Sequence, residues 1–176
     1  MKTQYARPLF LLALLMAQPA LQAQNAPQTA PAAGAEVNPL TQSALQQGMF
    51  NCVGRINQVG NFLGYGSQAG ALLMAPAGQA DQRLISYSME MPTDKSPAYI
   101  AAYFAPNQAT DCSAVYEAVV YWPQGCEALA RKEFAALKPM GPLKSAITVL
   151  EGGAATKVFL MPAGSGCLSI KKEMVL

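Results

Sequence analysis

The chain has 176 residues, with 12 Lys and Arg against 10 Asp and Glu, and it contains no histidine. The lack of histidine excludes Ser-His-Asp and Cys-His catalysis, HExxH zinc sites and histidine-based pH switches. A nearly balanced charge without a basic cluster argues against a nucleic-acid partner, because binding to nucleic acid depends on neutralising phosphates.

Residues 1–23 have the order of a secretory signal peptide. Lys2 and Arg7 precede the apolar run 8–17, and small and polar residues follow as far as Ala23. The run is too short to span a bilayer, which takes about 20 apolar residues. We expect cleavage after Ala23 and a periplasmic or secreted chain with no stable membrane anchor; a retained anchor helix is the alternative. Cleavage leaves 12 − 2 = 10 bases against 10 acids, so the mature chain is neutral.

Residues 24–37 are mostly Gln, Ala, Pro and Gly and show no periodicity, which predicts a disordered linker. Residues 38–176 are long enough to bury one hydrophobic core, so we expect a single domain there.

The domain is expected to begin with a helix over 38–63. Asn38 is suited to capping its free amides, and Pro39 fits the first helical position. Gly64 and Gly66 are expected to end it. Apolar residues recur near helical spacing along this segment, and they are Leu45, Met49, Cys52, Val53, Ile56, Phe62 and Leu63.

Four strands are predicted next. Residues 71–75 are apolar on both faces, as expected of a central strand, and residues 83–91 alternate as a half-buried antiparallel strand does. Residues 98–104 and 111–122 are the third and fourth strands. In the fourth, the period of two places one set of side chains on a common face: Cys112, Ala114, Tyr116, Ala118, Val120 and Trp122.

A second helix is expected from Cys126 to Leu137, followed by strands over 145–150, 156–161 and 167–175. The predicted fold class is therefore α+β: a single domain with an antiparallel or mixed sheet of about six to seven strands, two helices packed on it, and the order α-β-β-β-β-α-β-β-β. Because a helix followed by strands occurs twice, a duplicated half is one interpretation.

Four cysteines in an exported chain favour disulfides, with free buried thiols as the alternative. Cys112 and Cys167 both begin strands that we expect to run in the same direction, which would place them at one end of the sheet. We therefore favour Cys112–Cys167 and Cys52–Cys126 among the three connectivities.

No catalytic or metal-binding motif is recognisable. The glycines between Gly64 and Gly70 lack the spacing of a nucleotide loop and follow a helix where a strand is required. The cysteines show no CxxC spacing. The carboxylates that a glycosidase would need are present but not grouped, and they are Glu90, Asp94, Glu117 and Glu127. We expect no enzyme activity, no metal and no cofactor.

The strands over 98–104 and 111–122 carry aromatic residues on a second face. If the helices pack on one face only, the other exposes Tyr99, Tyr103 and Tyr121 beside Glu117, and exposed aromatic residues are typical of protein-binding surfaces. The alternative is that helices cover both faces.

These observations favour a small exported protein that binds another protein, such as an inhibitor or immunity-type protein or an accessory of an envelope assembly. A homodimer would be one such complex. The alternative is a carrier of small apolar ligands, with a pocket between helix and sheet lined by Met49, Met74, Met89 and Met91.

Overall fold

The computed structural model describes residues 37–94, 96–108 and 111–175. The predicted signal peptide and all of the predicted linker except Val37 lie outside these ranges. Among the described residues, no helix is long and apolar enough to cross a membrane.

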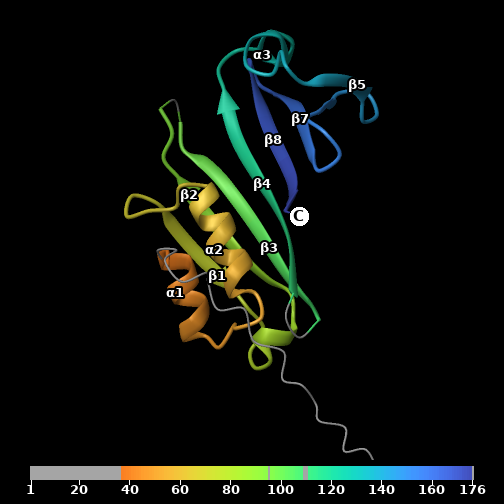
Figure 1. Ribbon diagram of the computed structural model, residues 1–176. Coiled ribbons are helices and arrows are strands. Elements are labelled where there is room, and N and C mark those ends of the chain that lie inside the picture. Colours follow the sequence, from red (N-terminus) through yellow and green to blue (C-terminus); the bar gives the residue numbers. More distant parts are fainter. Residues whose placement is uncertain (1–36, 95, 109–110, 176) are drawn as a thin grey trace, which may run out of the picture.

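The described chain forms one antiparallel sheet of eight strands with three helices (Figure 1). The helices are α1 (Pro39–Gln46), α2 (Val53–Phe62) and α3 (Cys126–Lys132). The strands are β1 (Gly70–Met74), β2 (Ile85–Met91), β3 (Ala98–Gln108), β4 (Asp111–Trp122), β5 (Lys138–Pro142), β6 (Thr148–Glu151), β7 (Thr156–Ala163) and β8 (Gly166–Val175). The expectation of one antiparallel sheet with helices packed on it is confirmed, although the described chain is mostly β, with less helix than the predicted α+β class implies. Its numbers, six to seven strands and two helices, are each too low by at least one.

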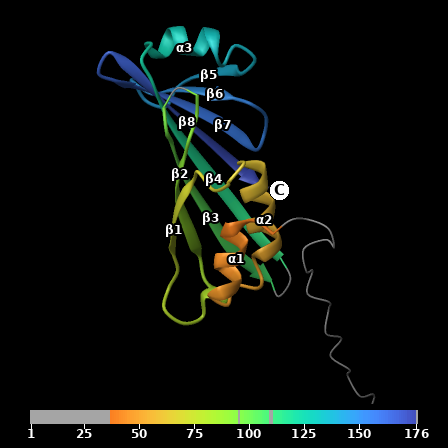
Figure 2. The same cartoon turned by 90° about the vertical axis from the view of Figure 1, so that its left-hand side faces the viewer.

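The strand order is β1-β2-β3-β4-β8-β7-β6-β5, so two four-stranded meanders join through β4 and β8. Each meander follows helical structure in the chain. Figures 1 and 2 show α1 and α2 lying against the first meander and α3 against the second. The two halves therefore repeat one arrangement, and the sheet has only two edges, β1 and β5.

The helix predicted over 38–63 is interrupted. α1 ends at Gln46, and Gly48 adopts a φ of 76°, a left-handed conformation that breaks the helical path. The start of α1 is as predicted, because the Asn38 side chain accepts a hydrogen bond from the Thr41 amide.

A polar cluster joins α1 to α2. Asn57 Oδ1 accepts hydrogen bonds from the Asn38 amide at 3.1 Å and from Thr41 Oγ1 at 3.0 Å. Asn38 Nδ2 donates to Asn61 Oδ1 at 2.9 Å. Gly60 lets α2 come this close, because a β-carbon there would stand 2.5 Å from Asn38 Nδ2. The two short helices are thus fixed to each other by buried hydrogen bonds as well as by their packing on the sheet.

Two predictions about the edges of the sheet were wrong. The segment expected to be a central strand is β1, which forms an edge and leaves Leu72 63 % exposed. The segment expected to end the second helix is β5, which contains Pro139 and Pro142. Proline is tolerated at a sheet edge, where a missing amide donor costs no internal hydrogen bond.

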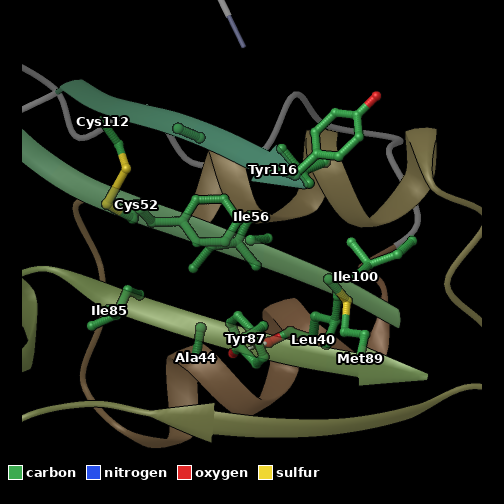
Figure 3. Close-up of a cluster of buried hydrophobic side chains, with 14 of the residues drawn as sticks. Leu40, Ala44, Cys52, Ile56, Ile85, Tyr87, Met89, Ile100, Cys112 and Tyr116 are labelled. Carbon is green, nitrogen blue, oxygen red and sulfur yellow. Dashed lines mark hydrogen bonds between the residues drawn. A yellow bond between two sulfur atoms is a disulfide. The ribbon is translucent and has the colours of Figure 1, made fainter. Parts of the chain in front are cut away.

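The core has two parts on one side-chain face of the sheet. The larger lies between α1, α2 and β2–β4, and Figure 3 shows Ile56, Tyr87 and Met89 within it. The smaller packs Leu129 of α3 against β6–β8. In β4, alternate residues from Cys112 to Val120 contact the larger core, and Trp122, the next in that series, contacts the smaller. All three helices therefore cover the same face.

The disulfides are Cys52–Cys112 and Cys126–Cys167, so the favoured connectivity was wrong. β8 runs antiparallel to β4, which places Cys167 opposite Trp122 and far from Cys112. Each bond joins the start of a helix, α2 or α3, to the second residue of its meander's last strand. Each closes a long loop and is expected to contribute about 4 kcal/mol by restricting the unfolded chain.

Candidate protein-binding face

The second face of the sheet carries no described helix. We name it the helix-free face, defined by the side chains of β1–β4 and β6–β8 that point away from both cores. Its apolar members are Leu72, Met74, Tyr99, Tyr103, Val115, Val119, Tyr121, Val149, Phe159, Met161, Leu168, Ile170 and Met174.

Strand register makes these side chains continuous. Tyr99 pairs with Val119, Val119 with Ile170, and Ile170 with Phe159, so one apolar row crosses β3, β4, β8 and β7. Val149 of β6 extends this row, since it pairs with Phe159. Side chains directly opposite each other in an antiparallel pair are close enough to touch. The result is an apolar strip and not a scatter of single residues.

The four residues proposed from the sequence lie together on this face. Tyr99 is 51 % and Tyr121 43 % exposed, whereas Tyr103 is half-buried between β2 and β4. Tyr99 Oη is 3.0 Å from Ser88 Oγ, which holds its ring across β2. Two exposed aromatic rings held on a rigid sheet give a large contact area at a small entropic cost.

Glu117 lies in the middle of the face and is paired. Its carboxylate is 2.5 Å from Lys172 Nζ on β8, with side-chain exposures of 28 % and 48 %. An exposed ion pair contributes little to stability, about 0–1 kcal/mol. Because it lies between Val115 and Val119, it adds a fixed polar contact within the apolar strip. Such a contact gives an interface register and specificity.

A shallow depression of about 490 Å³ lies at the β1 end of this face. Met74, Leu84 and Tyr103 line it, and the first two are 53 % and 60 % exposed. Leu72, Met74 and Leu84 were missed as candidates because residues 71–75 were assigned to the interior of the sheet. Alternation does not mark the face on β7 and β8, because Phe159 and Leu160 are both apolar and the polar Ser169 is the buried neighbour of Leu168.

Three polar side chains, Tyr116, Lys171 and Glu173, meet on the helix-bearing face between its two cores, and we name this group the polar seam. Lys171 Nζ donates to Tyr116 Oη at 2.8 Å and is 2.6 Å from the Glu173 carboxylate, while Tyr116 Oη lies 3.0 Å from the same carboxylate. The ring of Phe62 on α2 lies 5.6 Å from the ammonium group. Each polar group of the seam is thus satisfied by another.

The seam shifts ionisation in a consistent way. Burial raises the pKa of the Tyr116 hydroxyl, against the opposing effect of Lys171. Burial alone would raise the pKa of Glu173, but its hydrogen bonds with Lys171 and Tyr116 prevail and the pKa is lowered. Burial likewise opposes the charged form of Lys171, yet the same partners raise its pKa. The shifts of Lys171 and Glu173 favour the charged forms of their ion pair, and the shift in the pKa of Tyr116 keeps its hydroxyl protonated.

A groove of about 330 Å³ opens beside the seam, between α2, the middle of β4 and the end of β8. Phe62, Tyr116 and Glu173 are among its lining residues. The four methionines expected to line a carrier's pocket do not meet there: Met49, Met89 and Met91 are buried in the larger core, and Met74 lies on the helix-free face.

The four carboxylates considered for hydrolysis are dispersed. Glu117 is paired with Lys172, Glu127 on α3 is paired with Arg131, and Glu90 and Asp94 are exposed on β2 and the loop after it. Among the described residues, no group of three or more His, Cys, Asp or Glu is placed to hold a metal ion.

No protein-family model, no curated protein and no solved structure matches the chain.

Proposed function

We propose that this is a non-catalytic, exported protein that binds another protein on the helix-free face of its sheet. The observation that carries the proposal is the continuous apolar row from Tyr99 to Phe159, which no described helix covers. Monomeric proteins rarely leave so contiguous an apolar surface uncovered, and such patches mark interaction sites. The two disulfides fit an oxidising compartment, either the periplasm or the cell exterior.

The charges and apolar residues of the helix-free face predict the chemistry of the surface that would bind it. Its charges are few, and Glu117 and Lys172 neutralise each other, as do Glu151 and Lys157. A strongly charged surface would gain nothing here, so the matching surface is apolar with a few hydrogen-bonding groups. This agrees with an inhibitor or immunity-type protein that covers a secreted or periplasmic hydrolase, or with an accessory subunit of an envelope assembly.

The test begins with the exported protein purified under native conditions and weighed as an intact complex. The retained protein then serves as the probe in binding assays with Tyr99→Ala and Tyr121→Ala. We expect each variant to weaken binding by about 1 kcal/mol or more, as truncated interface aromatics do. Phe62→Ala is the matched control, because Phe62 is 65 % exposed on the other face. Equal losses for Phe62→Ala and Tyr99→Ala, with all variants folded, would refute the proposal.

A small-ligand carrier is the second candidate, and the groove beside Phe62 favours it. Its volume of about 330 Å³ is at the lower end of the range for ligand pockets. The same native measurement separates the two candidates. A native mass that exceeds the denatured mass by a small molecule indicates a carrier, and one that exceeds it by a protein indicates the binding function.

A further inference from the structure

The two edges of the sheet differ in how they are protected. β1 and β5 occupy equivalent places, since each is the first strand of its meander and the outermost in the sheet. An edge strand presents unpaired backbone amides and carbonyls that can pair with another chain. Proteins usually block this pairing with proline, charge or an irregular backbone.

β5 has all three protections. Its sequence contains Lys138, Pro139 and Pro142, and its register with β6 shifts between Pro139 and Gly141. Proline offers no amide to a new neighbour, and an irregular strand twists away from one.

β1 has none of these protections. Its five residues contain no charge and no proline, and they pair with β2 without a shift, from Gly70 opposite Glu90 to Met74 opposite Ser86. Leu72 and Met74 are 63 % and 53 % exposed, so the strand is regular, apolar and accessible. An edge of this kind is expected to be covered in the working protein.

We propose that β1 pairs antiparallel with β1 of a second copy of this chain, around a two-fold axis at Leu72. In this register Leu72 faces its own copy, Gly70 faces Met74, and Ala71 faces Leu73. A small residue thus meets a large one on each face, while the strand brings no like charges together. The pairing joins two eight-stranded sheets and makes their helix-free faces continuous, and it requires no other partner.

The strand's own sequence selects this occupant. Any extended segment could pair with the free backbone groups of β1. A second copy of β1 also places a small side chain opposite a large one on either side of Leu72. A two-fold contact closes on itself and consumes the exposed edge of each copy, which leaves the protected β5 at both ends. The dimer therefore does not grow into a fibre.

The oligomeric state of the exported, oxidised protein tests this by sedimentation over a range of concentrations. We expect a dimer whose dissociation constant rises about tenfold or more in Leu72→Lys, because two like charges then oppose each other at the axis. Leu143→Lys is the control, since Leu143 is 65 % exposed just beyond β5. A protein that stays monomeric up to about 100 μM, or a dimer that both variants weaken equally, overturns the proposal.

A cross-link tests the register. Facing residues of an antiparallel pair have Cα atoms about 4.5–5.5 Å apart, which a disulfide can span. We expect Leu72→Cys to form a covalent dimer on oxidation, and Leu143→Cys to form none. A dimer that Leu72→Cys fails to cross-link contradicts pairing around Leu72.

Discussion

The hydroxyl of Tyr121 lies directly against Gly166, across the β4–β8 pair. A β-carbon at residue 166 would stand 2.5 Å from this hydroxyl and would also collide with the backbone carbonyl oxygen of Trp122. The glycine lets the ring of Tyr121 lie down over the strand at the end of the helix-free face. One glycine thus positions one of the two exposed aromatic residues of the proposed interface.

Gly166→Ala is therefore expected to destabilise the fold by about 1–3 kcal/mol, because the Trp122 carbonyl belongs to the backbone and cannot move aside freely. Chemical denaturation measures the change. Gly54→Ala in α2 is the control, since a β-carbon there meets nothing within 4 Å. Equal unfolding midpoints for the two variants would contradict the close approach.

Asn57→Ala should cost about 1–3 kcal/mol of unfolding free energy. The substitution removes the acceptor of the buried Asn38 amide, and it leaves the buried Thr41 hydroxyl with Asn38 Oδ1 alone. Gln46→Ala, an exposed change in α1, is expected to stay within about 0.5 kcal/mol of wild type. If thermal or denaturant unfolding shows no difference between them, the cluster does not hold the two helices together.

The seam predicts a pH dependence. The pKa of Glu173 is lowered in the folded protein, so its stabilisation is complete above the ordinary value of 4.5 and is lost as pH falls through the folded value. Glu173→Gln removes this contribution. We expect its stability to fall less steeply than that of wild type between about pH 5 and pH 3.

Glu127→Gln is the matched control for that measurement, because it removes a carboxylate that is 86 % exposed on α3. As pH falls, the stability of Glu127→Gln should decrease about as steeply as that of wild type, whereas the stability of Glu173→Gln should decrease less steeply. If stability falls equally with decreasing pH in wild type, Glu173→Gln and Glu127→Gln, the seam contributes nothing to folding.

Peptide mapping without reduction should find Cys52 linked to Cys112 and Cys126 linked to Cys167. The digestion must cut between Cys112 and Cys126, and cleavage after Glu117 does so. A peptide that joins Cys52 to Cys126 would contradict the antiparallel pairing of β4 and β8.

Local patterns predicted most of the strands. The period of two in β2 and β4 correctly separated the buried side chains from Tyr121 and Glu117, because alternation is a property of the strand itself. The break at Gly48 and the short strand β5 were missed. Both depend on what surrounds the segment: a helix interruption that tertiary packing stabilises, and an edge position at which Pro139 is tolerated.

The disulfide pairing failed for a different reason. It required the direction of β8 relative to β4, which no local pattern of the sequence contains. The candidate face was accessible to sequence reasoning on β3 and β4, where Tyr99 and Tyr121 are prominent. Its extension to Phe159 and Ile170 depends on strand order, since only the pairing of β4 with β8 brings those residues beside Val119.

The most direct measurement of the central proposal is site-specific photo-cross-linking in the exporting cell. A photoreactive side chain replaces Tyr99 in one variant and Phe62 in another, two exposed aromatic residues on opposite faces of the sheet. We expect one discrete protein adduct from residue 99 and none from residue 62. An adduct from residue 62 alone, or no adduct from residue 99 in folded protein, would contradict binding on the helix-free face.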